Sequence, residues 1–413
     1  RQEADKLRKS DYQCKNDIIH VMHIVYNFIY FLLLPLLIVR DLFLLEKNKF
    51  GTVFQKLGFC LSRSEDPTIW LHGVSLGEIK IISPLAKKLI ANGHKVLVST
   101  TTNTGRKEIE QSFGDIAIKS ITFPYDLGFA YKKIIDTYRV KKLVLFESEF
   151  WPNLLASTPK DIKIMSLNTS ISDTSFSRLR SFKSIAKNMI NRIDLFLAQS
   201  QNTIDRLEIF GAKNIRLLGN IKINAENYEV DLNKKAKFAS NLGNSSTFKI
   251  VLGSSHDKEE EFVLNAWNQM PNSALIIAPR HPERIASVKK AFGSIPNVVI
   301  FDQVGDLFHL YAIADLAIVA GSIIFNKGHN FMEPVYANTT SITGSKLDNY
   351  KELKKKLCDT NIFETFTTEQ DLAQLLNKYK DDHYRIKKLN EQKETLQQIA
   401  GSYDSVLKAL DEL

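Results

Sequence analysis

The sequence has 413 residues, a hydrophobic share of 44% and a net charge of +9, which together indicate a globular chain too long for one ordinary core. Three widely spaced cysteines argue against a disulfide framework, and the nine histidines lack metal-binding spacing, so we expect no metal site. The charge comes mostly from scattered lysines. This suits anionic lipid headgroups or a nucleotide better than nucleic acid, although a lysine-rich soluble surface would look the same.

Residues 21–39 form an almost continuous apolar stretch, interrupted only by His23, Asn27 and Pro35. At about 1.5 Å per residue this stretch could just cross a bilayer core of roughly 30 Å. No small-residue cleavage site follows it, so we expect a retained membrane anchor, with Tyr26 and Tyr30 suited to the interface. A monotopic segment held in one leaflet is the alternative.

From Thr68 onward, apolar β-rich runs alternate with amphipathic helical segments, which predicts two Rossmann-like, doubly wound α/β domains that face a cleft. The strands expected in the first domain are 69–74, 95–100, 120–123, 142–146, 162–167, 195–198 and 215–218, and those in the second are 249–252, 274–277, 298–301, 316–319 and 340–342. The expected parts are 1–48, the N-terminal segment and anchor; 49–223, the N-terminal domain; 224–380, the C-terminal domain; and 381–413, a C-terminal helix that packs across both domains.

Residues 68–91 read as strand, tight turn and helix, with Ser75 and Gly77 in the turn and Glu78 at its mouth. Open α/β sheets bind ligands where parallel strands deliver their loops, so Glu78 is the leading catalytic candidate. Ser75 followed three residues later by Glu78 is equally a capping box, in which the glutamate only completes a helix start. The local sequence leaves both possibilities open.

Residues 147–153, ESEFWPN, end another strand with two carboxylates and an aromatic residue. Glu147 and Glu149 lie two apart, so they would share one side of an extended chain, and Pro152 would open the next helix. One of them could orient a sugar hydroxyl or assist Glu78 in proton transfer. The alternative is a buried, salt-bridged carboxylate beside a packed tryptophan.

Two motifs follow strands of the second domain. Residues 253–256, GSSH, place Ser254 and Ser255 where free N–H groups and hydroxyls suit a phosphate, although a serine N-cap is the commoner use. In residues 278–284, APRHPER, Arg280 and His281 could contact a phosphate or carboxylate by charge-assisted bonds, or belong to an ordinary polar turn.

Residues 321–334, GSIIFNKGHNFMEP, are the most specific stretch of the second half. Gly328 permits close backbone approach, and His329 and Asn330 are expected to start a helix that carries Glu333. Such a helix start can face a phosphate, and Glu333 can accept hydrogen bonds from ribose hydroxyls. His329 and Asn330 could instead merely cap the helix.

Taken in order, these motifs, with GNIK at 219–222 and GSKLDNY at 344–350, resemble the 3-deoxy-D-manno-octulosonic acid (Kdo) transferases of lipopolysaccharide synthesis. The resemblance implies a GT-B glycosyltransferase with an acceptor domain, a donor domain and an N-terminal anchor. It implies inverting transfer of Kdo from CMP-Kdo to the lipid A precursor, without metal or cofactor, at the cytoplasmic face of the bacterial inner membrane.

The resemblance also assigns roles by motif. It makes Glu78 the general base, with Glu147 or Glu149 assisting and Ser75 and Gly77 on the acceptor side. The residues it places around CMP or Kdo are Lys222, Ser254, Ser255, Arg280, His281, Gly321, Ser322, Gly328, His329, Asn330 and Glu333.

The sequence departs from the family pattern at Lys327, where a second glycine is usual, and at Ser170, where an arginine is usual. Two other functions stay open from the residues alone: a GT-B transferase that uses a UDP-sugar and a lipid acceptor, and a non-catalytic, membrane-tethered module that binds nucleotide sugars.

Overall fold

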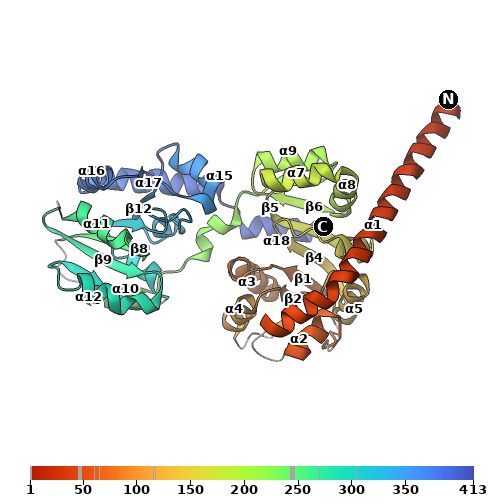
Figure 1. The fold of residues 1–413 in the computed structure, drawn as a ribbon, viewed down its shortest axis with the longest axis horizontal. Coiled ribbons are helices and arrows are strands. Elements are labelled where there is room, and N and C mark those ends of the chain that lie inside the picture. Colours follow the sequence, from red (N-terminus) through yellow and green to blue (C-terminus); the bar gives the residue numbers. More distant parts are fainter. Residues whose placement is uncertain are drawn as a thin grey trace. The chain divides into compact units, whose positions relative to one another are not determined.

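The computed structural model describes residues 2–44, 49–59, 61–64, 66–114, 116, 118–241, 247–268, 270–303 and 305–413. The chain forms two compact units, residues 1–227 with 400–413, and residues 228–399. Each unit is built on its own parallel sheet (Figure 1). The boundary expected at 223/224 lies at 227/228.

The N-terminal unit contains a seven-stranded sheet in the order β3-β2-β1-β4-β5-β6-β7. Every strand pair in it is parallel, and the strand positions expected from the alternating pattern are confirmed within two residues at nearly every end. The strands are β1 (Thr68–His72), β2 (Lys95–Thr100), β3 (Lys119–Thr122), β4 (Val140–Phe146), β5 (Lys163–Thr169), β6 (Leu195–Ala198) and β7 (Ile215–Leu217).

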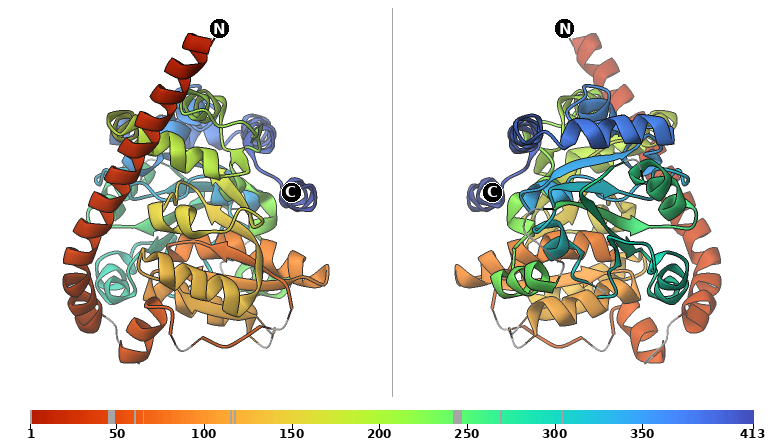
Figure 2. Two further views of the ribbon diagram at one scale, coloured as in Figure 1. Left: turned by 90° about the vertical axis from the view of Figure 1, so that its right-hand side faces the viewer. Right: turned by 90° about the vertical axis from the view of Figure 1, so that its left-hand side faces the viewer.

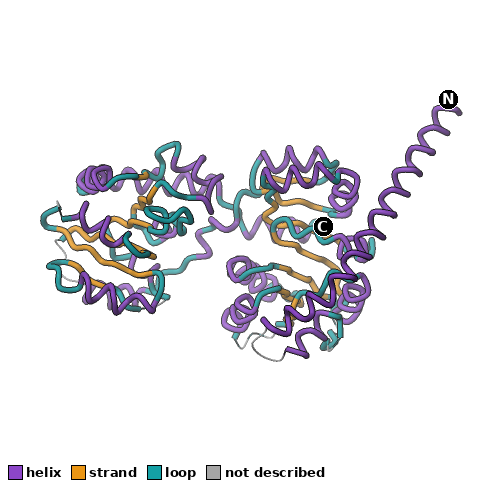
Figure 3. Tube along the Cα trace, viewed as in Figure 1, coloured by secondary structure: helices purple, strands orange, loops and turns teal. Residues whose placement is uncertain are grey.

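Helices alternate with these strands, as the tube in Figure 3 shows. They are α1 (Gln2–Leu44), α2 (Lys49–Lys56), α3 (Leu76–Ala91), α4 (Asn103–Phe113), α5 (Gly128–Tyr138), α6 (Pro152–Ser157), α7 (Asp173–Ser181), α8 (Lys183–Arg192) and α9 (Gln201–Ile209).

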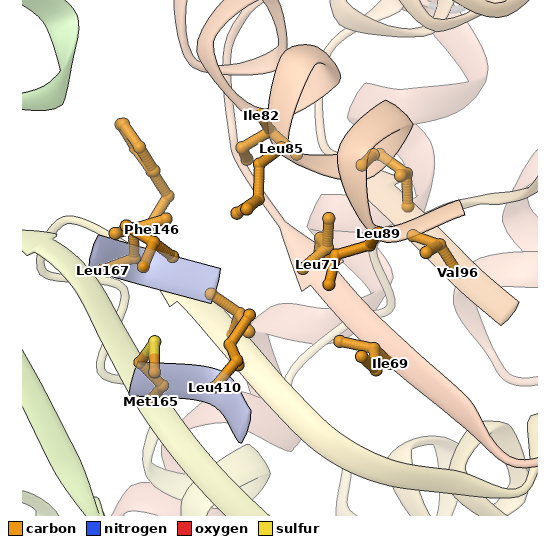
Figure 4. Packing of buried hydrophobic residues seen from close by; sticks show 14 of the residues in the cluster. Ile69, Leu71, Ile82, Leu85, Leu89, Val96, Phe146, Met165, Leu167 and Leu410 are labelled. Carbon is orange, nitrogen blue, oxygen red and sulfur yellow. The ribbon is translucent and has the colours of Figure 1, made fainter. Parts of the chain in front are cut away.

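One of the two hydrophobic cores of this unit joins the sheet to α3 and to the end of the chain. Leu71, Leu85, Phe146 and Met165 pack with Leu410, which comes from α18 (Tyr403–Asp411) (Figure 4). The other core, around Trp70, Phe123 and Tyr131, covers the opposite side chains of the same strands. Burial on both faces explains why these strands read as continuous apolar runs.

The C-terminal unit contains a six-stranded parallel sheet in the order β10-β9-β8-β11-β12-β13. The five strands expected there are confirmed, and a sixth, β13, was missed because it has only two residues. The strands are β8 (Phe248–Ser255), β9 (Ser273–Pro279), β10 (Val298–Ile300), β11 (Leu316–Val319), β12 (Thr340–Gly344) and β13 (Thr365–Phe366).

The helices of this unit include α10 (Leu232–Asn241), α11 (Glu259–Trp267), α12 (Ile285–Phe292), α13 (Leu307–Tyr311), α14 (Glu333–Tyr336), α15 (Lys351–Leu353), α16 (Glu369–Tyr379) and α17 (Asp382–Ile399). Residues 381–413, expected as one helical tail, hold two helices. α17 belongs to the C-terminal unit and α18 to the N-terminal unit, so the chain passes between the units twice.

Helix α1 includes the one described helix that is long and apolar enough to cross a membrane, over residues Val21–Phe43. It packs beside α2 and α8 of the N-terminal unit (Figures 1 and 2).

Candidate active site

Three glutamates lie at the topological switch point of the N-terminal sheet. From β1 the chain continues to β2 and β3 on one side, whereas β4 returns to the other side of β1 and is followed by β5, β6 and β7. Ligands of open α/β sheets bind in the crevice outside such a point. Glu78 follows β1 in the chain, and Glu147 and Glu149 follow β4. Topology therefore brings together the three carboxylates singled out in the sequence.

Glu78 is held in place by the residues just before it. Its Oε2 accepts a 2.6 Å hydrogen bond from the Val74 N–H, and its Oε1 accepts a 3.1 Å bond from the Ser75 hydroxyl. Ser75 is the N-cap of α3 and in turn accepts from the Glu78 N–H at 3.4 Å. The serine half of the expected capping box is therefore present, but the carboxylate accepts from the Val74 N–H and not from that of the cap residue; Glu78 is half-buried and stays at the sheet edge.

Two glycines give Glu78 its surroundings. A Cβ at Gly73 would meet Ile82 Cδ1 at 2.6 Å and Glu78 Cβ at 3.1 Å, so only glycine lets the loop pass so close to α3. Gly77 is exposed in the first helical turn, and a Cβ there would meet only the Ser75 hydroxyl, at 4.0 Å. The surface beside Ser75 and Gly77 is therefore open.

Glu149 has a strongly perturbed acidity. Burial is the main reason that the pKa of its carboxyl is raised to about 7. The hydrogen bond from Trp151 lowers this pKa, whereas the negative charges of Glu78 and Glu147 raise it. The Trp151 indole N–H donates to Glu149 Oε2 at 2.8 Å. A carboxyl that titrates near neutral pH is suited to proton transfer.

The Glu147 side chain pairs with a lysine. It adopts a left-handed backbone conformation with φ of +58°, which turns the chain, so the extended geometry expected for Glu147 and Glu149 is wrong. Glu147 forms a 2.5 Å salt bridge with Lys222, a residue of the same unit. Lys222, expected on the donor side, is thus occupied with a carboxylate of the acidic site. Strained φ values of this kind in non-glycine residues cluster at functional sites.

His72 is a site residue that the sequence motifs do not indicate. It ends β1, is fully buried, stacks on Phe123 with 3.6 Å between ring centroids, and places Nδ1 3.0 Å from the Ser99 hydroxyl. Burial lowers its pKa to about 3, so the ring is neutral and its 3.9 Å approach to Glu149 is no ion pair. Its Nε2 has no hydrogen-bond partner among the described residues and lies 3.9 Å from Glu149 Oε2.

The C-terminal sheet has its own switch point, between β8 and β11. His256 follows β8, Arg280 and His281 follow β9, and the loop containing His329 follows β11. His256 Nε2 and His329 Nε2 lie 2.8 Å apart, and their rings are stacked. His281 approaches His256 edge-on, with 5.3 Å between ring centroids. The sequence motifs 253–256, 278–284 and 321–334 thus converge on one cluster of basic side chains.

The two facing histidines can share only one proton between their Nε2 atoms. Burial lowers the pKa of His329 to about 4, and the charges of His256, Arg280 and His281 lower it further. Burial also lowers the pKa of His256. The pair is therefore neutral near pH 7, while the exposed Arg280 beside it has no carboxylate partner among the described side chains. A permanent cation beside neutral rings suits an anionic group.

Glu259 organises these loops and was missed because it reads as part of an acidic helix start. It is fully buried, and its carboxylate accepts backbone N–H bonds from His256, Gly321, Ile323 and Ile324 at 2.9–3.2 Å. The backbone donors expected to bind a phosphate in the motif 253–256 are therefore partly taken by the protein itself. Side chains, rather than this backbone, carry the anion-binding capacity of the cluster.

Two of the expected donor-site serines are structural. Ser255 is buried and its hydroxyl donates to Glu260 Oε1 at 2.8 Å, while Arg284 bonds the same carboxylate. Ser322 is also buried, between Val319, Thr343 and Gly344. Their hydroxyls hold the loops and are not open to a ligand. Ser254 is half-buried at an irregularity in β8, with φ of +56°.

The loop after β11 closes on itself through its glycines. Gly321 and Gly328 have φ of +77° and +69°, and the Gly328 N–H donates to the Gly321 carbonyl at 2.7 Å. A Cβ at Gly321 would meet the His329 ring at 2.6 Å, so this glycine admits the histidine. Lys327 is exposed within the loop.

The helix expected to begin at His329 and Asn330 begins four residues later, at Glu333, and has only four residues. Asn330 instead makes a local turn by accepting from the Met332 N–H at 3.2 Å, and it donates to the Tyr228 hydroxyl at 2.7 Å. Glu333 is half-buried close to the side chains of Tyr228, Tyr311 and Tyr350. Burial is the main cause of the raised pKa values of these tyrosines, and the negative charge of Glu333 raises them further.

No group of three or more His, Cys, Asp or Glu side chains in the described ranges is arranged to hold a metal ion.

Residues 51–225 match the family model described as "3-Deoxy-D-manno-octulosonic-acid transferase (kdotransferase)". Over 332 residues the chain is 28% identical to a 3-deoxy-D-manno-octulosonic acid transferase of Haemophilus influenzae, covering 74% of this chain and 77% of that one. It is 29% identical over 320 residues to a bifunctional glycosyltransferase/methyltransferase of Fusobacterium nucleatum, covering 71% of this chain and about half, 49%, of that protein.

Among solved structures, a glycosyltransferase from Rickettsia africae aligns with 84% of this chain and 98% of its own, at a TM-score of 0.56 and 16% identity. That likeness concerns the fold alone, and it agrees with two Rossmann-like domains of the GT-B class. The family match over residues 51–225 and these relatives confirm the resemblance carried by the ordered motifs: the chain is similar to Kdo transferases.

Proposed function

We propose that the protein transfers Kdo from CMP-Kdo to a hydroxyl of the lipid A precursor, with inversion at the anomeric carbon. The observation that carries this proposal is that one switch point presents acidic side chains and the other presents basic ones. The N-terminal sheet presents three carboxylates, and the C-terminal sheet presents histidines and an arginine. A transfer from an anionic nucleotide sugar to an alcohol needs a proton acceptor and an anion binder.

On the acceptor side, Glu78 takes the proton of the attacking hydroxyl. The Val74 N–H and the Ser75 hydroxyl fix the orientation of its carboxylate, which removes the need to order it during the reaction. The hydroxyl oxygen forms the new bond to the anomeric carbon, the bond from that carbon to the CMP phosphate breaks, and the proton remains on Glu78. Attack from the face opposite the leaving CMP inverts the anomeric configuration.

Glu149 assists because its charge state changes near neutral pH. When ionised, it adds a negative charge close to Glu78, and a like charge makes a carboxylate a stronger proton acceptor. The two groups then titrate as a coupled pair. His72, neutral and fixed against Ser99, lies beside Glu149 and adds no positive charge that would favour its ionised form.

On the donor side, the exposed Arg280, beside the hydrogen-bonded pair His256 and His329, holds the phosphate of CMP-Kdo and stabilises the charge that grows on it as it leaves. Ser254, His281, Asn330 and Glu333 complete the surroundings of the nucleotide or the sugar. We propose no cofactor and no metal, since CMP is already a good leaving group and cationic side chains are available.

A lipid acceptor would explain why α1 contains a long apolar segment. A chain held at the inner membrane, with its catalytic domains on the cytoplasmic face, meets lipid substrate at a raised effective concentration.

The test is an assay of product and leaving group with purified chain, CMP-Kdo and the tetra-acylated lipid A precursor. Mass spectrometry should detect the glycolipid with added Kdo, together with released CMP. UDP-sugars supplied in place of CMP-Kdo should give neither a glycolipid product nor UDP. Transfer from a UDP-sugar, or donor binding without any transfer, would contradict the proposal.

A further inference from the structure

Helix α1 is docked along its apolar length onto the N-terminal unit by one stripe of residues. Side chains that the unit shields recur at helical spacing, whereas those between them are exposed. The shielded positions are Met22, His23, Tyr26, Tyr30, Leu34, Leu37, Ile38, Asp41 and Leu42.

Polar contacts fix both ends of this stripe. Near its start, the Tyr26 hydroxyl donates to Asp126 Oδ2 at 2.7 Å, and Asn153 donates to Asn27 Oδ1 at 2.6 Å. The Asp126 N–H donates to the Tyr30 hydroxyl at 2.8 Å. Hydrogen bonds of this kind specify an orientation, which purely apolar packing against a helix would not.

Near the end of the helix, Asp41 is buried and forms a 2.6 Å salt bridge with the equally buried Lys56 of α2. The Tyr125 hydroxyl donates to the same carboxylate at 2.9 Å. Removing one partner of a buried pair leaves an uncompensated charge, so this contact resists separation of α1 from the unit.

The docked stretch is as long as a bilayer is thick. From Met22 to Asp41 the helix rises about 29 Å at 1.5 Å per residue, against a hydrocarbon core of about 30 Å. A spanning α1 would therefore carry its docking partners into the hydrocarbon. Helix α8, which contacts α1, bears the exposed Lys183 and Lys187, and placing these charged side chains in hydrocarbon is unfavourable.

The other side of α1 is an exposed apolar face, with Phe28, Phe31 and Leu36 each at least 65% exposed. Other exposed phenylalanines of this unit are Phe43 at the end of α1, Phe50 and Phe54 on α2, Phe59, and Phe129 on α5. The segment after α2 touches α5, since a Cβ at Gly58 would meet Ala130 Cα at 3.0 Å. Apolar and aromatic side chains flanked by lysines match the chemistry of an anionic lipid surface.

We infer that α1 does not span the membrane but lies in the plane of one leaflet, docked on its own domain, with its exposed face in the lipid and the lysines of α8 at the headgroups. This inference rests on the proposed function only for the presence of a membrane. It also places the acidic site near the lipid, because Asn153, which bonds α1, ends the same motif that contains Glu149.

Two native cysteines on either side of the apolar stretch provide the test. The Cys60→Ser variant keeps Cys14 as its labelling site, and the Cys14→Ser variant keeps Cys60. The third cysteine, Cys358, is buried in both variants. Each variant is bound to sealed vesicles of phosphatidylethanolamine and phosphatidylglycerol and treated with a membrane-impermeant maleimide. An in-plane α1 predicts that Cys14 and Cys60 react from the same side. Reaction of one only after detergent is added would overturn the inference.

Spin labels measure depth independently of topology. In a chain with Cys14 and Cys60 replaced by serine, labels at Val25→Cys, Leu32→Cys and Val39→Cys lie on one exposed face of α1, and Glu110→Cys on α4 is the water-exposed control. Similar shallow depths at the three helix positions are expected, whereas a maximum at residue 32 with shallow ends would contradict the in-plane orientation. A chain that stays in solution beside the vesicles overturns the inference, but Kdo transfer to a detergent-solubilised acceptor would still test the proposed function separately.

Discussion

The two sheets of the molecule have the same kind of topology but present opposite chemistry at their switch points. Beside β1 and β4 the protein gathers Glu78, Glu147 and Glu149, with one lysine pairing the middle carboxylate. Beside β8 and β11 it gathers three histidines and Arg280, which has no carboxylate partner among the described side chains, and the buried Glu259 there accepts backbone N–H bonds. The fold supplies the location in both cases, and the side chains supply the function.

The comparison teaches how each site treats its carboxylates. In the N-terminal unit, burial and mutual repulsion leave Glu149 able to bind a proton near pH 7. In the C-terminal unit, Glu259 receives several N–H bonds and serves only to shape the loops. A carboxylate that can exchange a proton near pH 7 and a structural one are therefore distinguished by their partners, not by their sequence neighbourhood.

The largest effect should come from Glu78→Gln. Glutamine can still accept from the Val74 N–H and so keeps the helix start, but it cannot take up a proton. Turnover should fall by about two to four orders of magnitude. Glu110→Gln, an exposed change on α4, is the matched control and should leave turnover unchanged. Initial rates of CMP release measure both variants, and wild-type rates for Glu78→Gln would remove it from the mechanism.

The next effect belongs to the other switch point. Arg280→Gln removes the cation beside His329 without touching the acidic site. One charge-assisted hydrogen bond is worth about 1.5–3 kcal/mol, so the donor KM should rise about 10- to 100-fold while kcat changes far less.

The control for this change is Lys290→Gln on the neighbouring α12, also exposed. Steady-state kinetics with varied CMP-Kdo separates the two constants. A loss confined to kcat would place Arg280 with the catalytic groups and so break the proposed division between the two sites.

A smaller change in rate should follow from the acidity of Glu149. Because its pKa is about 7 and its ionised form strengthens Glu78, kcat/KM should rise with pH through neutrality. Glu149→Gln keeps an acceptor for Trp151 and should lose about tenfold in rate together with this limb of the pH profile. If the pH profile of Glu149→Gln still rises through neutrality as in the wild type, the titrating group that controls the rate is not Glu149.

Stability gives a second readout of the same residue. The folded-state pKa lies above the ordinary value of 4.5, so the folded chain binds more protons than the unfolded chain between about pH 4.5 and 7, and stability falls as pH rises through that window. Relative to Glu149→Gln, the wild type should lose on the order of 2–3 kcal/mol across it. Urea unfolding at pH 5 and pH 8 measures this difference, and an equal pH dependence in both chains would contradict the buried, protonated state.

The smallest effect concerns the Lys222–Glu147 pair. Both side chains are more than 30% exposed, so a double-mutant cycle with Lys222→Met and Glu147→Gln should give a coupling of only about 0.2–1 kcal/mol in unfolding free energy. CMP-Kdo affinity should stay near that of the wild type, because Lys222 is engaged on the acidic side. A tenfold loss of affinity in Lys222→Met would instead return this lysine to the donor site.

The sequence predicted the fold well because buried parallel strands have a simple signature. Continuous apolar runs located twelve strands, and the missed strand, β13, is too short to show a period. Glu78, Glu149 and Arg280 could be found because each follows such a run directly. The local conformation of the loops could not be found, since the left-handed Glu147 and the late start of α14 depend on contacts with distant segments.

Residues whose role depends on burial escaped prediction. Glu259 and Glu260 look like a solvent-exposed helix start until the loop after β11 and Arg284 cover them. His72 is the last residue of an apolar strand, and only the packing of Phe123 and Ser99 around it reveals a neutral ring facing Glu149. For the same reason Ser255 and Ser322 seemed open to ligand and are not.

The central claim is that the carboxylates act on the acceptor while the basic cluster holds the donor. Calorimetric titration of CMP-Kdo into the Glu78→Gln chain tests it most directly, because that variant should have lost turnover. The account predicts an affinity equal to that measured for wild-type chain in the absence of acceptor. Loss of CMP-Kdo binding in this variant would contradict it, since Glu78 would then belong to the donor site.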